Sequence, residues 1–262
     1  MTSRTRLFLI LWLAGMAGVL SFLLVDISAL IAAMPVPEGA SPAELPRPAI
    51  LKLVTLIQPS ILTALAVIVG IWLAPRVGLH APAAEAASER SPIWPAFKPQ
   101  LLPGVLAGLS SGAAIAFTWV IAKPSLPAEF IVRAEEFNKF IPAPVRILYG
   151  GFTEEILLRW GVMTFLVWLM WKLFQRGRGN PQDTWLVLSI LVSALLFGIG
   201  HLPVASAIAG GLTVPIIVYV IIGNSLFGIV AGFLYWRRGL EAAMVAHMTA
   251  HLVIITAIFL AL

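Results

Sequence analysis

Long apolar runs without a charged side chain dominate the pattern of this chain. They are Leu7–Val25, Leu53–Pro75, Pro99–Ala122, Thr184–Trp236 and Ala242–Leu262. A helix needs about 20 apolar residues to cross the hydrocarbon core of a bilayer, and each of these runs reaches or approaches that length. Because a spanning helix satisfies its backbone polar groups within itself, the runs predict an all-α, polytopic transmembrane helical bundle.

We predict about seven spans, within a range of six to eight. The run Thr184–Trp236 is long enough for two spans, and Gly210, Gly211 and Pro215 mark the turn between them, since paired glycines and a nearby proline interrupt a helix. The predicted spans are 7–30, 51–73, 101–122, 144–170, 185–208, 212–235 and 241–262.

The connections between the spans are short and differ in composition. The segment Pro124–Pro142 carries phenylalanines beside balanced charges, which predicts a short helix at the membrane interface. Ala81–Pro99 and Gln175–Asp183 are predicted linkers. We therefore divide the chain into an N-terminal part, 1–143, with three spans and the interfacial segment, and a core of four spans, 144–262.

The basic residues in alternate connections predict the orientation. With the N-terminus in the cytoplasm, the inner segments hold Arg4, Arg6, Arg76, Arg90, Lys98, Lys172, Arg176, Arg178, Arg237 and Arg238. The outer segments then hold Arg47, Lys52, Lys123, Arg133, Lys139 and Arg146. Because cytoplasmic loops carry the excess of Lys and Arg, we expect the N-terminus inside and the C-terminus outside, in a bacterial inner (cytoplasmic) membrane.

Composition excludes several other classes of protein. Only 11% of the residues are charged, whereas soluble domains carry roughly 25%. The chain has no cysteine, which removes disulfides, thiolate metal sites and a cysteine nucleophile. The net charge of +5 comes from dispersed residues without a basic stripe, so we expect no nucleic acid partner. The lipid bilayer is the expected environment.

Three charged residues lie well inside the fourth predicted span, away from its ends. They are Glu154, Glu155 and Arg159, and an ionisable side chain at mid-bilayer costs at least about 2.5 kcal/mol, so each is a functional candidate. Glu155 and Arg159 are four apart and can form a structural ion pair, whereas Glu154 is turned by roughly 100° from Glu155. One carboxylate is thus neutralised and the other is left to react. The alternative is a buried ion-pair network that only joins helices.

Three of the four histidines also lie in predicted spans. His201 follows Phe197 by four residues, and glycines between them allow close approach of another helix. His247 and His251 are one helical turn apart, a spacing that suits two ligands of one metal or two donors to a developing anion. For His201 alone, the alternative is a hydrogen-bonded packing residue. Together with Glu154, the histidines favour a catalytic site over a structural network.

Depth in the membrane gives a further expectation. Counted at 1.5 Å per residue, Glu154, His247 and His251 lie near the middle of the bilayer or in its inner half. His201 lies too far out unless its span starts later or breaks. Part of the predicted boundaries or of the topology must therefore be wrong.

Three motifs in this order resemble the CAAX prenyl endopeptidase and bacteriocin-processing family of intramembrane proteases, also called the CPBP or Abi family. The family pattern is Glu-Glu-x-x-x-Arg, then Phe-x-x-x-His, then His-x-x-x-Asn or a similar polar residue. The chain carries these as Glu154-Glu155-x-x-x-Arg159, Phe197-x-x-x-His201 and His247-x-x-x-His251. The resemblance covers about 144–262, and the first three spans match only in being apolar.

The resemblance implies a role for each matched position. Glu154 would be the general base that takes a proton from the attacking water, and His201 would hold that water. His247 and His251 would stabilise the oxyanion of the tetrahedral intermediate, and Glu155 with Arg159 would position the helix. His251 departs from the frequent Asn of the family. An Asn amide donates at any pH, whereas a neutral histidine donates from one nitrogen only.

The histidine at 251 leaves a zinc site open as an alternative. His201, His247 and His251 would be a sufficient ligand set for zinc, with Glu154 as the base. Against it, the chain has no His-Glu-x-x-His motif, and the resemblance points to a glutamate-dependent site that works without metal. The sequence therefore commits to no cofactor.

The sequence predicts an intramembrane endopeptidase that hydrolyses a membrane-associated or prenylated peptide with glutamate-activated water. Its expected partner is a peptide or lipidated protein substrate, and a bacteriocin or leader peptide fits as well as a C-terminal C-a-a-X peptide. Two alternatives remain. One is a non-catalytic membrane scaffold or bacteriocin self-immunity protein, and the other is a small proton-coupled transporter in which buried Glu and His residues relay protons.

Overall fold

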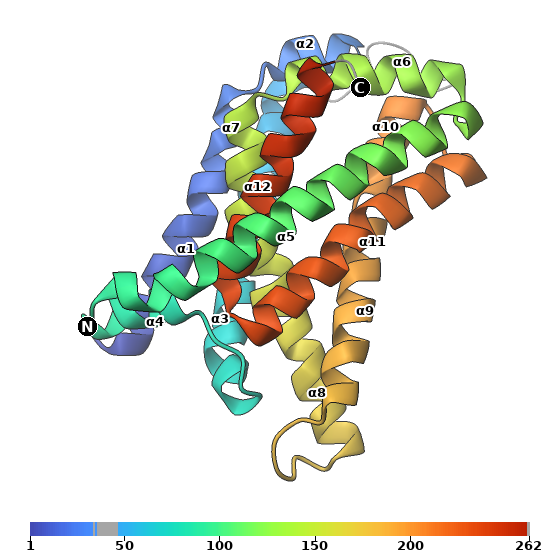
Figure 1. Cartoon of the computed structure of the whole chain (residues 1–262). Coiled ribbons are helices and arrows are strands. Elements are labelled where there is room, and N and C mark those ends of the chain that lie inside the picture. The colour runs from blue at the N-terminus through green and yellow to red at the C-terminus, as the bar shows by residue number, and fades with distance from the viewer. Residues whose placement is uncertain (34, 36–46, 261–262) are drawn as a thin grey trace.

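The computed structural model describes residues 1–33, 35 and 47–260, and the ordered elements in this part of the chain are helices (Figure 1). Seven helical segments are long and apolar enough to cross a membrane. They are Ser3–Leu24, Pro48–Arg76, Ile93–Ser125, Ala143–Phe174, Asp183–Ala209, Val214–Arg237 and Leu240–Phe259. This arrangement confirms the predicted all-α bundle of about seven spans.

Most spans contain one long α-helix, and two are divided. The α-helices are α1 (Ser3–Ser21), α2 (Ile27–Ala33), α3 (Pro48–Leu73), α4 (Pro82–Glu89), α5 (Ile93–Ala122), α6 (Ala128–Phe140), α7 (Ala143–Val145), α8 (Thr164–Phe174), α9 (Asp183–Gly200), α10 (Leu202–Ala209), α11 (Val214–Arg237) and α12 (Leu240–Phe259). Two π-helical segments, η5 (Arg146–Glu154) and η6 (Ile156–Met163), join α7 to α8 and complete the fourth span.

The first predicted span is too long. It was expected to cover 7–30, but the spanning segment ends at Leu24 and α2 begins at Ile27. The Asp26 carboxylate accepts a hydrogen bond from the Ala29 amide at 3.0 Å, as a helix N-cap does. The polar side chain therefore starts a new helix, and α2 lies across the end of the bundle instead of continuing α1 (Figure 1).

The third predicted span is too short. The segment Ala81–Pro99 was expected to be a linker, but it contains α4 and the first turns of α5, which begins at Ile93. Pro99 and Pro103 lie inside α5. Prolines are tolerated in membrane helices because neighbouring groups can satisfy the carbonyls that they leave unpaired.

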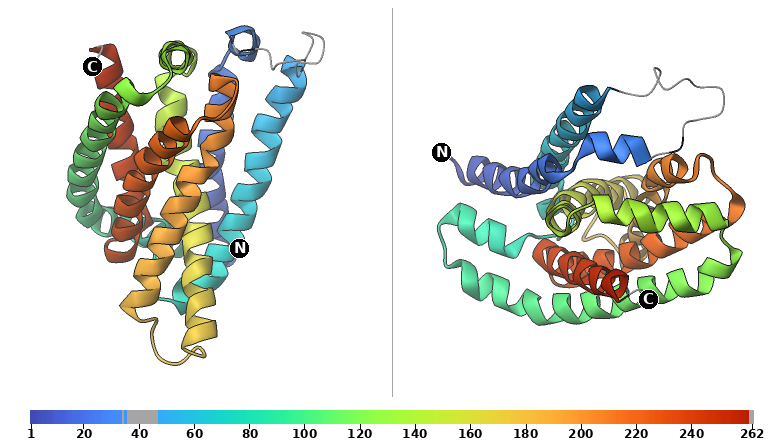
Figure 2. Two further views of the ribbon diagram at one scale, coloured as in Figure 1. Left: turned by 90° about the vertical axis from the view of Figure 1, so that its right-hand side faces the viewer. Right: turned by 90° about the horizontal axis from the view of Figure 1, so that it is seen from above.

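The short helix predicted within 124–142 and the predicted Gly turn are present. α6 lies across the end of the bundle in the view from above (Figure 2). Its Arg133 donates a hydrogen bond to the carbonyl of Ala209 at 3.1 Å, which ties α6 to the end of α10. The next residue, Gly210, has a φ of 74°, and this left-handed conformation favours glycine. The chain thus turns where the sequence predicted.

The helix that carries two of the candidate histidines packs on a row of glycines. Gly104, Gly108 and Gly112 of α5 face α12, and a Cβ at Gly104 or Gly112 would lie 2.8 Å from α12 atoms. Small residues at this spacing let two membrane helices approach closely. The α5 glycines therefore set the distance of α12 from the rest of the bundle.

Candidate active site

The four candidate residues line one cavity of about 770 Å³ in the membrane-spanning part of the molecule. Glu154 comes from η5, His201 from the junction of α9 and α10, and His247 and His251 from α12. Most of the wall is apolar. Three spans that are separate in the sequence thus place their polar groups against the same space.

The fourth span is π-helical around the two carboxylates. Wide turns with i→i+5 hydrogen bonds are rare and occur frequently at functional sites. η5 ends at Glu154 and η6 begins at Ile156, with Glu155 between them in α-helical geometry. Glu155 is fully buried, whereas the side chain of Glu154 is 19% exposed and lines the cavity. The two neighbouring acids therefore lie in different environments.

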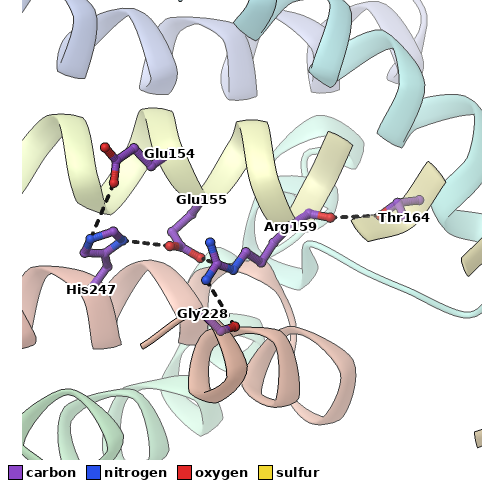
Figure 3. Close-up of polar contacts among 6 residues, drawn as sticks. All are labelled: Glu154, Glu155, Arg159, Thr164, Gly228 and His247. Atoms are coloured by element: carbon purple, nitrogen blue, oxygen red, sulfur yellow. Dashed lines mark hydrogen bonds and ion pairs between the residues drawn. The ribbon is translucent and has the colours of Figure 1, made fainter. Parts of the chain in front are cut away.

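His247 lies between the two carboxylates, as Figure 3 shows. Its Nδ1 is 2.7 Å from Oε1 of Glu155, and its Nε2 is 3.7 Å from Oε2 of Glu154. Because a carboxylate only accepts, Nδ1 carries the proton in the bond to Glu155. Nε2 is therefore the nitrogen presented to Glu154 and to the cavity.

The buried ion pair of Glu155 and Arg159 lies next to this histidine. Nε of Arg159 is 3.3 Å from Oε2 of Glu155, at the i, i+4 spacing that predicted the pair, and both side chains are fully buried. Arg159 also donates to the carbonyl of Gly228 at 3.2 Å, which connects the fourth span to α11 (Figure 3). Its guanidinium lies over the rings of Phe197 and Phe227, at 5.1 and 5.7 Å from their centroids. The buried guanidinium has lost its hydration, and these partners compensate for that loss.

Glu155 has a contact that the sequence did not predict. The spacing assigned it to Arg159 alone, but the same carboxylate also holds His247. The contact joins residues 92 positions apart in the chain. No local pattern contains that information, because it depends on how α12 packs against the fourth span.

His201 ends α9 and begins the short helix α10. Its Nδ1 lies 2.8 Å from the Phe197 carbonyl, and the Phe197 ring contacts the imidazole edge-on at a centroid distance of 4.7 Å. A carbonyl only accepts, so Nδ1 donates and Nε2 keeps its lone pair. His201, which the depth count placed too far out, nevertheless lines the same cavity as Glu154, although α9 begins at Asp183, two residues before the predicted span.

His251 stacks on His247, with ring centroids 4.9 Å apart. Its Nδ1 is buried without a hydrogen-bond partner among the described residues. A Cβ at Gly150 would lie 2.7 Å from Nε2 of His251 and 2.9 Å from Nε2 of His247. The glycine therefore makes room for both imidazoles beside the fourth span.

The arrangement does not fit the zinc alternative. Among the described residues, no group of three or more His, Cys, Asp or Glu side chains has the geometry of a metal site. Nδ1 of His247 is bound to Glu155 and Nδ1 of His201 to a backbone carbonyl, which leaves the Nε2 atom of each ring unengaged by these bonds.

Several polar residues of the cavity wall were missed at the sequence level. They are Gln58, Arg146, Tyr149 and Asn224. Arg146 carried a signal, because a positive charge close to the start of a span is costly, but it was counted only for the topology. Gln58 and Asn224 are uncharged amides in runs without charged residues, and nothing nearby in the sequence connects them with the site.

Comparison with known proteins gives one family. Residues 136–253 match the family described as type II CAAX prenyl endopeptidase Rce1-like. The matched segment contains all three motifs and confirms the resemblance that they predicted. Neither the curated proteins nor the solved structures contain a match.

Proposed function

Because residues 136–253 match the Rce1-like family of type II CAAX prenyl endopeptidases, we propose that the chain is a CAAX-type intramembrane protease and that it hydrolyses a peptide bond with water activated by Glu154. One observation carries this proposal. Glu154, His201, His247 and His251 come from three spans and line a single cavity.

The first step needs a base and a water that is held in place. In the proposal, Nε2 of His201 accepts a hydrogen bond from the water, because the Nδ1 of this residue is engaged by Phe197. The Glu154 carboxylate takes the other proton as the water oxygen attacks the carbonyl carbon of the scissile bond. Such general-base catalysis contributes typically 10²- to 10⁴-fold to the rate.

The second step stabilises the charge that develops on the carbonyl oxygen. His247 and His251 stack side by side next to Glu154, and we assign N–H donation to the oxyanion to this pair. Because Nδ1 of His247 donates to Glu155, this residue donates to the oxyanion from Nε2 in its doubly protonated form. Donors that are fixed before the reaction lower the barrier because they do not reorganise. Glu154 then gives its proton to the leaving amine as the C–N bond breaks, so the carboxylate is regenerated.

Glu155 and Arg159 position these groups without touching the substrate. Glu155 fixes the ring of His247 through Nδ1, and Arg159 neutralises Glu155 and connects it to α11. A bound imidazole is held in one tautomer and one orientation by such a partner. We propose positioning roles for both residues.

The substrate is proposed as a membrane-associated peptide or a lipidated protein, because the site lies within the spans and its cavity has mainly apolar walls. A non-catalytic scaffold and a proton-coupled transporter remain the competing functions. Both leave a peptide intact, so mass spectrometry of the products separates them from a protease.

The test measures cleavage of membrane-anchored peptides by purified protein in vesicles. We expect Glu154→Gln and His201→Ala to lower kcat by 10² to 10⁴ without changing the amount of folded protein. Glu89→Gln and His80→Ala are the matched controls, because both residues are exposed and lie outside the cavity. Full activity of either site variant would contradict the mechanism, and loss of activity together with stoichiometric zinc on chelation would contradict the metal-free proposal.

A further inference from the structure

Arg146 is a charged residue of a span that the proposed mechanism does not use. Its Nε donates to the carbonyl of Ile141 at 3.2 Å, and its Nη2 donates to the carbonyl and the side-chain oxygen of Asn138 at 2.9 and 2.8 Å. All three acceptors are neutral. Among the described residues no carboxylate pairs with Arg146, in contrast to Arg159, which is paired with Glu155. The positive charge therefore remains available while the guanidinium is held in place.

The position of this charge relates it to the proposed chemistry. Arg146 and Glu154 line the same cavity, with Gly150 between them on the same segment. Eight residues separate them, which is at most roughly 12 Å at 1.5 Å per residue. An extended peptide covers about 3.3 Å per residue. A peptide whose scissile bond lies at Glu154 thus reaches Arg146 with its third or fourth residue.

The neighbourhood of Arg146 is also cationic. A second cavity of about 560 Å³ adjoins the first and shares Ile115 and Ile254 with it. Lys123 and Lys139 line this second cavity, and so does Asn138, which holds Arg146. Lys123 is paired with Glu135 at 2.9 Å. The second cavity and the adjoining part of the first therefore carry more positive than negative charge.

We propose that Arg146 is a specificity-determining residue that binds the C-terminal carboxylate of the substrate. Arginine binds carboxylates through charge-assisted hydrogen bonds in a fixed geometry, and the contacts to Asn138 and Ile141 hold this guanidinium in advance. This inference rests on the proposed function, because it names the part of the substrate that the site recognises.

The competing explanation is structural. Lys, Arg and His side chains frequently bind the last carbonyls of a helix, and Arg146 does this at the end of α6. A merely structural arginine would affect every substrate equally. The test must therefore compare two substrates that differ only in the carboxylate.

The experiment uses one membrane-anchored peptide in two forms, with a C-terminal acid or a C-terminal amide. We expect the wild-type protein to prefer the acid by about tenfold or more in kcat/KM, the effect of a hydrogen bond to a charged group. Arg146→Gln should bring the ratio close to one, and Arg146→Lys should restore part of it. Arg133→Gln is the matched control, because Arg133 also binds a helix-terminal carbonyl but lies outside both cavities, and it should keep the ratio.

A binding measurement separates this inference from the proposed function. The Glu154→Gln protein is titrated with both peptides, and binding is followed by fluorescence anisotropy, which needs no cleavage. Tighter binding of the acid that disappears with Arg146→Gln supports the inference even where no peptide is cut. Equal binding of acid and amide overturns it, and so does an equal loss of both activities in Arg146→Gln.

Discussion

At the scale of single residues, the site depends on the one carboxylate that has two partners. Glu155 binds Arg159 on one side and His247 on the other. It therefore connects the stability of the bundle with the orientation of a proposed oxyanion donor. The two roles are separable by substitution, because Arg159 contacts Glu155 and affects His247 only through that carboxylate.

We expect Glu155→Gln to destabilise the protein strongly. Loss of one partner leaves the buried Arg159 charge uncompensated, which costs about 3–5 kcal/mol in known buried pairs. The double variant Glu155→Leu with Arg159→Met should recover much of that stability, since apolar residues of similar volume replace the pair. It should remain inactive, because Nδ1 of His247 still lacks its acceptor.

The thermal unfolding midpoint in detergent and the rate of peptide cleavage check this prediction. Glu135→Gln is the control for stability, because the pair of Glu135 with Lys123 is half exposed and such pairs contribute at most about 1 kcal/mol. An active double variant would show that His247 needs no partner at Nδ1.

At the scale of elements, the close packing of α12 on α5 places His247 and His251. A Cβ at Gly108 would lie 2.5 Å from the Ala246 carbonyl and from Cβ of Thr249. The three α5 glycines at a spacing of four were visible in the sequence. The apolar pattern does not show which helix they contact.

We expect Gly108→Leu to force α12 away from α5 and to lower activity at least tenfold, because small misplacements of reacting groups cost rate steeply. Ala113→Leu places the same side chain on the same helix at an exposed position and should have little effect. Cleavage assays and thermal unfolding of both variants measure the difference. Equal effects in the two variants would show that helix contact is unimportant here.

At the scale of the whole molecule, the seven spans place the two ends of the chain toward opposite ends of the bundle (Figure 1). The segments at the N-terminal end carry ten Lys and Arg residues, against six at the other end. We propose on this basis that the N-terminus is cytoplasmic. The cavity residues Phe137, Ile141 and Arg146 belong to the opposite end, so the substrate would then enter from the outer side.

Single cysteines test this topology, because the chain has no cysteine of its own. We expect Asn180→Cys, in the connection between α8 and α9, to react with an impermeant thiol reagent only from the cytoplasmic side. Glu129→Cys, on the exposed surface of α6, should react only from the other side. The reverse pattern would place the cavity toward the cytoplasm and would overturn the charge-based orientation.

The sequence by itself determined the class of the protein, the turn at Gly210 and the polar residues of the candidate site. These follow from local rules, since hydrophobic length, glycine pairs and charges inside apolar runs act within one segment. Only the tertiary structure decided that Glu155 holds His247, that Arg146 faces the cavity of Glu154, and that α5 continues through Pro99. The first two depend on helices that meet only in the packed bundle, because the histidine partner of Glu155 and the walls of the cavity come from other spans.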